Sequence, residues 1–441
     1  MDVTNWVLHM LPQCNRAVLA GHMSVDSFLT TIDREVLAQA PTPDELTPQE
    51  AKRSVVEFGL IGASIARHRQ QADLRLVSSP EESFSTLTAS GNSVAFAQYM
   101  QQLANRTGTG HPGRDAYASL VRWNAPDMEV RWQGQILGRL ESVFNDGLVR
   151  TYTDNPGEHQ FLLLLKRAEA LETAANALLL PIAEGTIAVD SSEAIEAVGV
   201  AVRLLEAVHK INLEFTHNGQ GGKPIFDENH FLDILRQFAV HWKTGDVPPS
   251  GAQDPEFLKR DFYLGMDFPD YARHVKRIFP ALLDRERDEL QDAMQLPSIP
   301  QRVAQKVAVD SQVLAHGTSP DLLGLAQSFP FLVNYYLLMR ANAHVSASHL
   351  MLTKRFLFKP MRERDRLGIP DSPLVSNRSG TTGMLEQLLE TLAKHRQNHA
   401  MKGFSQLPLE QLLLLSPTVA NESSRSRLEL PEVVDYGRVK Q

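Results

Sequence analysis

One segment constrains the fold more than any other. Residues 160–180, QFLLLLKRAEALETAANALLL, are apolar around nearly the whole circumference of a helix. A helix without a polar face is stable only when other elements cover it on all sides. Helical periodicity recurs elsewhere in the chain, at 193–215, 230–243, 325–358 and 383–398. Because strand signals are restricted to 74–77 and 128–132, we expect an all-α fold around the 160–180 helix.

The helix boundaries can be predicted from the residues that flank them. Pro330 places the start of the 325–358 helix after residue 330, and a Ser-Gly-Thr-Thr run at 379–382 is expected to cap the last helix. Breaker-rich stretches divide the chain into three parts. We expect a mostly helical N-terminal region at 1–120, a catalytic domain at 121–400 and a partly ordered tail at 401–441. The polar, proline-rich segment 359–383 is expected to be a lid.

Charge and cysteine content exclude several classes of protein. The 441 residues carry 44 basic and 52 acidic side chains, a net charge of −8 that argues against general nucleic-acid binding. Cys14 is alone, which excludes an internal disulfide, a thiolate zinc site and an iron–sulfur cluster. The chain has no apolar run of membrane-spanning length, and Asp2 stands where a secretory signal carries a basic residue. We expect a cytoplasmic protein with no membrane partner.

Familiar cofactor and catalytic motifs fail when their context is considered. GTGHPG at 108–113 follows no strand, and Pro112 would interrupt the helix that a dinucleotide needs. HNGQGGKP at 217–224 has the wrong spacing for a phosphate loop, with proline in place of Ser/Thr. The 15 histidines show no zinc-ligand spacing. The sequence has no signature of a hydrolase, a kinase or a metalloprotease.

One histidine remains, inside the longest apolar helix. The segment HLMLTKRF, 349–356, places His349 among leucines, with Arg355 six and Phe356 seven residues later. Taken alone, such a histidine is more often a core residue than a ligand. A rigid helix with an imidazole and apolar neighbours is nevertheless what axial haem ligation requires. His344, one and a half turns earlier, is the alternative ligand.

These residues resemble the haem-dependent superfamily of indoleamine and tryptophan 2,3-dioxygenases, with closest likeness to its monodechloroaminopyrrolnitrin synthase branch. The proximal histidine of that family opens a His-Leu-x-Leu/Ile pattern, followed by a basic and an aromatic residue. An insertion, a small-residue loop and a closing helix come next, as they do here at 358–398. The resemblance implies a helical haem core, haem b on His349, and O2 or peroxide as co-substrate.

Two further blocks of the sequence resemble this family in the same order. HFLDILRQFAVHWK, 230–243, resembles the segment that carries a pocket phenylalanine and a carboxylate-binding arginine, which implies these roles for Phe231 and Arg236. The segment 151–178 resembles the distal helix with its Tyr-Thr-x-x-Pro-x-Glu opening. It implies that Phe161, Leu165 and His159 line the substrate side.

The residues expected to contact the cofactor depart from the family pattern in this chain. The family usually has an arginine three residues before the proximal histidine, where this chain has Ser346. Arg340, or another cation, must then approach a haem propionate, with Arg355 as a second basic contact. The loop is SGTTG, so Ser379, Gly380 and Thr381 are expected near the cofactor and Thr382 near the substrate.

The function that follows is a haem-dependent oxygenase acting on a small aromatic substrate, tryptophan- or indole-derived, in secondary metabolism. The resemblance leaves dioxygenation, hydroxylation and oxidative rearrangement open, and it leaves a homodimer open. Two other classes fit the same residues: a non-catalytic haem protein that binds or senses gases, and a helical scaffold without cofactor. A Soret band excludes the scaffold, and substrate-dependent oxygen consumption excludes the sensor.

Overall fold

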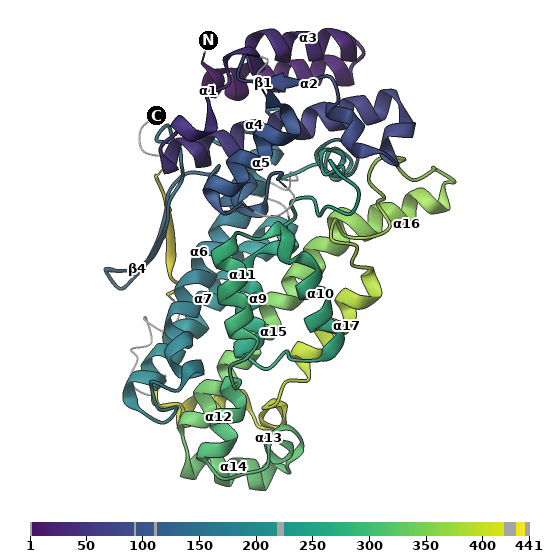
Figure 1. The fold of residues 1–441 in the computed structure, drawn as a ribbon. Helices are drawn as coiled ribbons and strands as arrows, with labels where there is room; N and C mark the ends of the chain where they lie inside the picture. The colour runs from purple at the N-terminus through teal and green to yellow at the C-terminus, as the bar shows by residue number, and fades with distance from the viewer. Residues whose placement is uncertain (1, 92–93, 110–112, 218–224, 419–428, 437–441) are drawn as a thin grey trace.

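The computed structural model describes residues 2–91, 94–109, 113–217, 225–418 and 429–436. Helices dominate it, which confirms the expected all-α class (Figure 1). The two expected motif loops at 108–113 and 217–224 fall partly outside the described residues. The helices are α1 (Val3–Asn5), α2 (Leu11–Leu19), α3 (Val25–Glu35), α4 (Pro48–Ala72), α5 (Phe96–Thr107), α6 (Pro156–Glu184), α7 (Ser192–His217), α8 (Glu228–His230), α9 (Pro255–Tyr263), α10 (Pro269–Ile278), α11 (Asp284–Ala293), α12 (Ile299–Lys306), α13 (Ser311–His316), α14 (Ser319–Ser328), α15 (Phe331–Thr353), α16 (Lys359–Arg366), α17 (Glu386–Gln397) and α18 (Leu409–Leu415).

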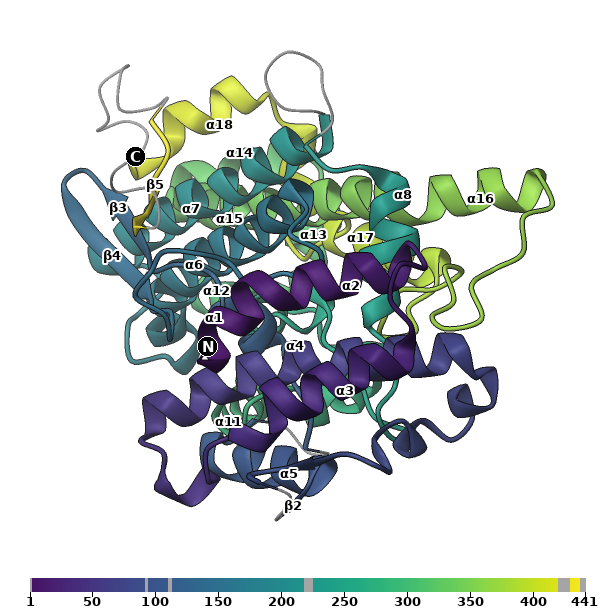
Figure 2. The same cartoon turned by 90° about the horizontal axis from the view of Figure 1, so that it is seen from above.

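Three long helices, α6, α7 and α15, form the centre of the molecule (Figures 1 and 2). The most extensive packing in the described chain joins α7 to α15 and α6 to α7. Their facing side chains are fully buried, among them Leu171, Leu205 and Leu332. The 160–180 helix is therefore an interior element, as its uniformly apolar sequence predicts, and α15 begins after Pro330 as expected.

The start of α6 is fixed by the residues of its Tyr-Thr-x-x-Pro-x-Glu opening. Glu158 is fully buried and accepts hydrogen bonds from the Thr153 amide at 3.1 Å and the Thr153 hydroxyl at 2.7 Å. His230 lies 2.8 Å from the same carboxylate, so α8 is tied to the first turn of α6. Tyr152 stacks on Phe238 with ring centroids 4.1 Å apart. These contacts therefore fix the direction in which α6 leaves the preceding chain.

The N-terminal helices α2 to α5 form a layer over one end of the central helices (Figures 1 and 2). This layer has its own hydrophobic core, to which Trp6, Phe58 and Tyr99 contribute. Phe238 and Trp242, from the expected catalytic domain, are part of that core. The two regions are thus joined by shared apolar packing as well as by the chain.

Strands are few, and one of the two expected strands is a helical turn. Met128–Trp132 forms β3 as expected, pairing antiparallel with β4 (Gln135–Leu140) and with β5 (Glu432–Asp435). Leu74–Val77 is a 3-10 turn instead, because Asp73 caps it by accepting from the Arg75 amide. A further two-stranded ladder joins β1 (Thr88–Ala89) to β2 (Val94–Ala95). Within the expected tail, β5 extends the sheet, and Met401, Phe404 and Leu412 are buried in the core.

Two helical expectations need correction. The 230–243 helix ends early: a π-helical turn at Phe231–Leu235 and a 3-10 turn at Arg236–Phe238 lead into irregular chain. The last helix begins at Glu386, after a Leu385 N-cap without a side-chain cap bond, so the Ser-Gly-Thr-Thr run does not cap it. The first third of the expected lid is helix α16, whose second residue is Pro360.

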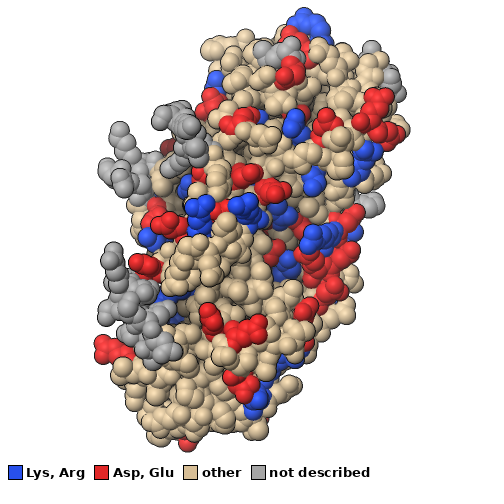
Figure 3. All heavy atoms as spheres, turned by 90° about the vertical axis from the view of Figure 1, so that its left-hand side faces the viewer, with Lys and Arg blue, Asp and Glu red and all other residues tan. Residues whose placement is uncertain are grey.

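The surface on the left of Figure 1 carries basic and acidic side chains interspersed (Figure 3). Among the described residues, no single helix has both the length and the apolar character to cross a membrane. One pair of consecutive helical segments in the described chain, 319–328 and 331–366, is long and apolar enough when the two are taken together, but the pair is bent by 117°.

Candidate functional site

A large cavity lies among α6, α7, α9, α15 and α17, closed on one side by the loop before α17. The space between its lining atoms is about 1360 Å³ with the open mouth included. Most lining side chains are apolar, as is usual for sites that bind small molecules. Of the residues predicted from sequence it brings together Phe161, Leu165, Phe231, Arg236, His349, Gly380, Thr381 and Thr382.

His349 projects from α15 into the wall of this cavity. Burial, with a smaller effect of the Arg396 charge, lowers the pKa of His349 to about 4, so the imidazole is neutral at pH 7. No hydrogen bond joins either ring nitrogen to another described residue, and the nearest ring is that of Phe257, with centroids 6.0 Å apart. A neutral imidazole with an available nitrogen is the form that binds metals.

Aromatic rings line the side of the cavity formed by α6. Phe161 lies edge-on to Phe231 at a centroid distance of 5.6 Å, and both belong to a cluster with Phe215, Phe226 and Phe356. Phe356 lies 5.9 Å from Phe231. Such rings provide a rigid apolar surface for a planar ligand. The packing at the start of α6 is tight here, because a Cβ on Gly157 would lie 2.1 Å from Phe226.

Arg236 holds the loop that closes the cavity. Its guanidinium donates to the Thr381 hydroxyl at 3.0 Å, to the Ser376 carbonyl at 2.8 Å and to the Ser379 carbonyl. Its Nε atom is buried and has no hydrogen-bond partner. Burial, only partly offset by Asp371, lowers the pKa of Arg236 to about 10. The expected contact of Arg236 with a substrate carboxylate stays a prediction, since in this structure its terminal nitrogens bind the loop.

The cation nearest to the histidine comes from α17 and was not predicted. Arg396 lines the cavity and donates to the Ser346 hydroxyl at 3.0 Å, the position where the family resemblance leads one to expect an arginine. Its other nitrogens donate to the buried Asp261 carboxylate at 2.9 and 2.5 Å. Asp261 also accepts from the Tyr271 hydroxyl. Sequence reasoning could not identify Arg396, because its partner Asp261 is 135 residues away.

Four of the predicted residues do not line this cavity, and the alternative ligand does not either. Arg340 lies in a separate hollow beside Arg203. Arg355 pairs with Glu228 at 3.0 Å. His159 pairs with Asp154 at the surface, 3.1 Å away. Ser379 contributes its carbonyl to Arg236 from outside, and the ring of His344 packs on His209 with centroids 5.3 Å apart.

Two carboxyl groups in the wall were also missed. Glu172 of α6 and Asp254, the N-cap of α9, both line the cavity, and both are buried. A signal was present in the sequence: Lys166, Glu169 and Glu172 recur every three residues inside an otherwise apolar helix. Charged side chains at that spacing share a helix face, and in a buried helix they must find partners.

The cavity thus combines a neutral imidazole, an aromatic wall, two arginines and a pair of acids. The described residues contain no group of three or more histidine, cysteine or acidic side chains placed to hold a metal ion. No protein-family model matches the sequence, and no curated protein matches it significantly. Any functional conclusion must therefore be argued from the geometry of the cavity itself.

Proposed function

We propose that this chain is a haem-dependent oxygenase that acts on a small aromatic, tryptophan- or indole-derived substrate. The observation that carries the proposal is His349: a neutral imidazole whose ring nitrogens bond to no other described residue, facing a mainly apolar cavity. The residues of the cavity fit a histidine-ligated haem, since the histidine is on a rigid helix and apolar side chains surround it. When bound, the haem supplies oxygen activation, which protein side chains alone do not provide.

The remaining residues support the binding of a planar aromatic substrate beside the cofactor. His349 would hold the iron, and Arg396, which donates to Ser346, would be the nearby cation for an anionic group of the cofactor. Phe161 and Phe231 would contact the aromatic ring of the substrate, and the apolar lining would exclude water. Arg236 and Thr381, at the loop, would meet a substrate carboxylate.

The proposal is tested first by the absorption spectrum. We expect the purified protein, reconstituted with haemin, to show a Soret band that His349→Ala abolishes or strongly shifts. His344→Ala is the matched control, because this histidine is on the same helix but outside the cavity, and its spectrum should be unchanged. Loss of the band in His344→Ala with an unchanged His349→Ala spectrum would falsify the ligand assignment. The absence of any Soret band in the wild type would refute the haem proposal as a whole.

The second test concerns chemistry. Oxygen consumption with a panel of tryptophan derivatives, followed by mass spectrometry of the products, distinguishes an oxygenase from a gas-binding protein. We expect one oxygen atom or two oxygen atoms to be incorporated, or an oxidised rearranged product. A haem-loaded protein that consumes no oxygen with any member of the panel supports the sensor function instead.

A further inference from the structure

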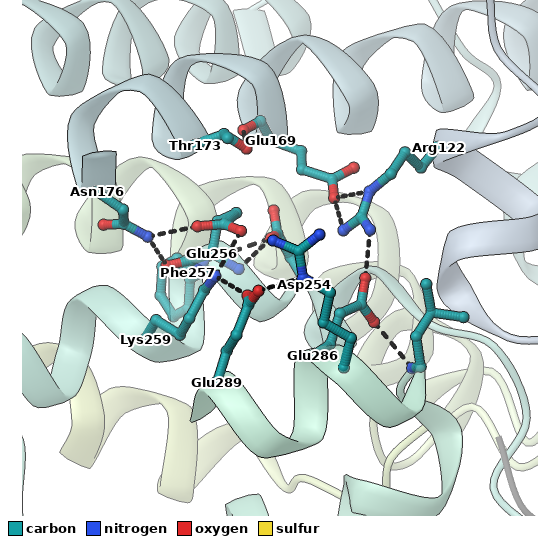
Figure 4. Close-up of polar contacts among 12 residues, drawn as sticks. Arg122, Glu169, Thr173, Asn176, Asp254, Glu256, Phe257, Lys259, Glu286 and Glu289 are labelled. Atoms are coloured by element: carbon teal, nitrogen blue, oxygen red, sulfur yellow. Dashed lines mark hydrogen bonds and ion pairs between the residues drawn. The ribbon is translucent and has the colours of Figure 1, made fainter. Parts of the chain in front are cut away.

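Buried acids and bases cluster where α6, α9 and α11 meet, next to the cavity. In the first cluster Arg122 donates from Nε to Glu169 at 2.6 Å, and it also pairs with Glu286 (Figure 4). In the second, Lys259 lies 2.8 Å from both Glu256 and Glu289 (Figure 4). Each of these clusters has two carboxylates for one base. Glu289 reaches solvent, with 36% of its side chain exposed, so water can stabilise the excess charge of the second cluster. The first cluster has no such exposure, and there burial raises the pKa of Glu169 to about 8, so that cluster holds its own proton at neutral pH.

A third cluster has the same ratio of acids to bases and is likewise buried. Arg260 is fully buried, and its Nη1 lies 3.1 Å from Glu172, whose residue exposure is 2%. Asp254 is 7% exposed and lies within hydrogen-bonding reach of Glu172. One oxygen of Asp254 accepts from the Glu256 amide at 2.9 Å and the Phe257 amide at 3.4 Å, which leaves the other oxygen for Glu172.

Charge balance requires a proton in this third cluster. Two ionised carboxylates beside one guanidinium would leave a net negative charge in a buried place, at a cost of several kcal/mol. The bases of the neighbouring clusters, Arg122 and Lys259, are already paired with two acids each, and Arg396 across the cavity is paired with Asp261. Burial raises the pKa of Asp254 well above its usual range, and the charges of Glu172 and Glu256 add to this effect. One proton shared between two carboxyl groups restores neutrality.

Buried polar atoms without hydrogen-bond partners are also found in this part of the molecule. The Tyr117 hydroxyl is buried without a hydrogen-bond partner, within electrostatic range of Glu169, Asp254 and Glu172. Oε2 of Glu169 is also buried without a partner. Unsatisfied buried polar atoms are rare in native proteins, and they mark places where water or protons are accommodated. The charges of Glu172 and Asp254, which line the cavity, act on the Tyr117 hydroxyl.

We propose that Glu172 and Asp254 share one proton at neutral pH and act as the proton-exchanging acid of the cavity. The proton leaves the carboxyl oxygen of Asp254 and forms a bond with a lone pair on an oxygen or nitrogen atom of the bound ligand. The pair is left doubly ionised beside Arg260, and a proton from water in the cavity restores it. The identity of the ligand rests on the proposed function, whereas the shared proton and its exchange do not.

Infrared spectroscopy of the free protein tests the shared proton. Other buried acids such as Glu169 and Glu57 also absorb as protonated carboxyl groups at neutral pH. We expect one of the carbonyl stretches in this region to disappear in both Asp254→Asn and Glu172→Gln. The asparagine keeps the oxygen that caps α9 and can donate to Glu172, so this variant should fold. Glu289→Gln, an acid of the neighbouring cluster that reaches solvent, is the control and should keep the band. A wild-type spectrum without a band that both variants remove would overturn the proposal.

Deuterium exchange tests whether the proton faces the cavity. Because both acids line an open cavity, transfer into D2O should shift the band within the mixing time. A band that persists for hours would identify a sealed structural acid and refute the exchange role. In the haem-loaded enzyme, Asp254→Asn should lower kcat and remove the alkaline limb of its pH profile while KM stays unchanged. A protein without a Soret band refutes the proposed function, but leaves the infrared outcome to decide this proposal.

Discussion

The contact between Arg236 and the loop 376–381 gives the sharpest quantitative prediction. Three hydrogen bonds run from one buried guanidinium to two carbonyls and the Thr381 hydroxyl. Bonds from a charged donor contribute about 1.5–3 kcal/mol each, so the lower end of that range gives about 4–5 kcal/mol. The pKa of Arg236, lowered from 12.5 to about 10 by burial, corresponds to a penalty of about 3 kcal/mol. The difference leaves the loop held by about 1 kcal/mol.

Hydrogen exchange measures this energy directly. The Gly380 amide donates to the Met384 carbonyl at 2.7 Å, and the Gly383 amide donates to the Gly380 carbonyl at 2.8 Å. Both bonds should open when Arg236→Ala releases the loop. A loss of about 1 kcal/mol corresponds to a roughly fivefold faster exchange of these two amides. Amides in the middle of α6 should keep their wild-type rates, because the packing of that helix does not depend on the loop.

Arg378→Ala is the matched control for this experiment. Arg378 is in the same segment, but 60% of its side chain is exposed and its partner is Asp365, 43% exposed. Exposed ion pairs contribute little to stability, so loop exchange should change less than about threefold. Unchanged exchange in Arg236→Ala, or an equal increase in both variants, would refute the assignment of Arg236 as the residue that holds the loop.

Two further predictions concern stability. Gly157→Ala should lower the free energy of unfolding by about 1–3 kcal/mol, because the added Cβ would clash with Phe226. Gly324→Ala, in open space on α14, should raise the free energy of unfolding by up to about 1 kcal/mol. Equal denaturation midpoints for the two variants would contradict this. Burial raises the pKa of Glu57 to about 7, above its unfolded value, so the stability that protonated Glu57 contributes is complete at low pH and is lost as pH rises through about 7. Wild-type stability should therefore fall relative to Glu57→Gln between about pH 5 and pH 8, and parallel pH–stability curves would show that Glu57 titrates normally.

The long helices could be predicted from sequence because their apolar patterns are local and leave no alternative. The 230–243 segment shows where this reasoning fails. Its apolar residues recur at helical spacing, but Phe238 and Trp242 pack into the core of the N-terminal region from irregular chain. Trp242 lies so close to α4 that a Cβ on Gly62 would be 2.3 Å from its ring. Periodicity indicates which residues are buried, but it does not indicate which core buries them.

The residues of the candidate site also fall into those that could be predicted from the sequence and those that could not. His349, Phe231 and Arg236 could be predicted because their segments resemble those of the haem-dependent dioxygenases, and all three line one cavity. Arg396 and Asp254 could not, since each acquires its role from a partner far away in the chain, Asp261 and Glu172 respectively. Buried charge is recognisable in a sequence only where the surrounding segment is otherwise apolar, as it is around Glu172 in α6 and is not around Arg396 in α17.

The charges of the cavity also determine how a ligand would affect its closing loop. The carbonyls of Ser376 and Ser379 accept from Arg236, and the Thr382 carbonyl accepts from Arg277. A carboxylate binds a guanidinium more strongly than neutral carbonyls do, and it offers two oxygens at the spacing of the terminal nitrogens. An anionic ligand that reached Arg236 would therefore compete with the loop for the same donors. Only Nε of Arg236 is without a partner, so a ligand that binds there leaves the loop closed, whereas one that takes the terminal nitrogens must release it.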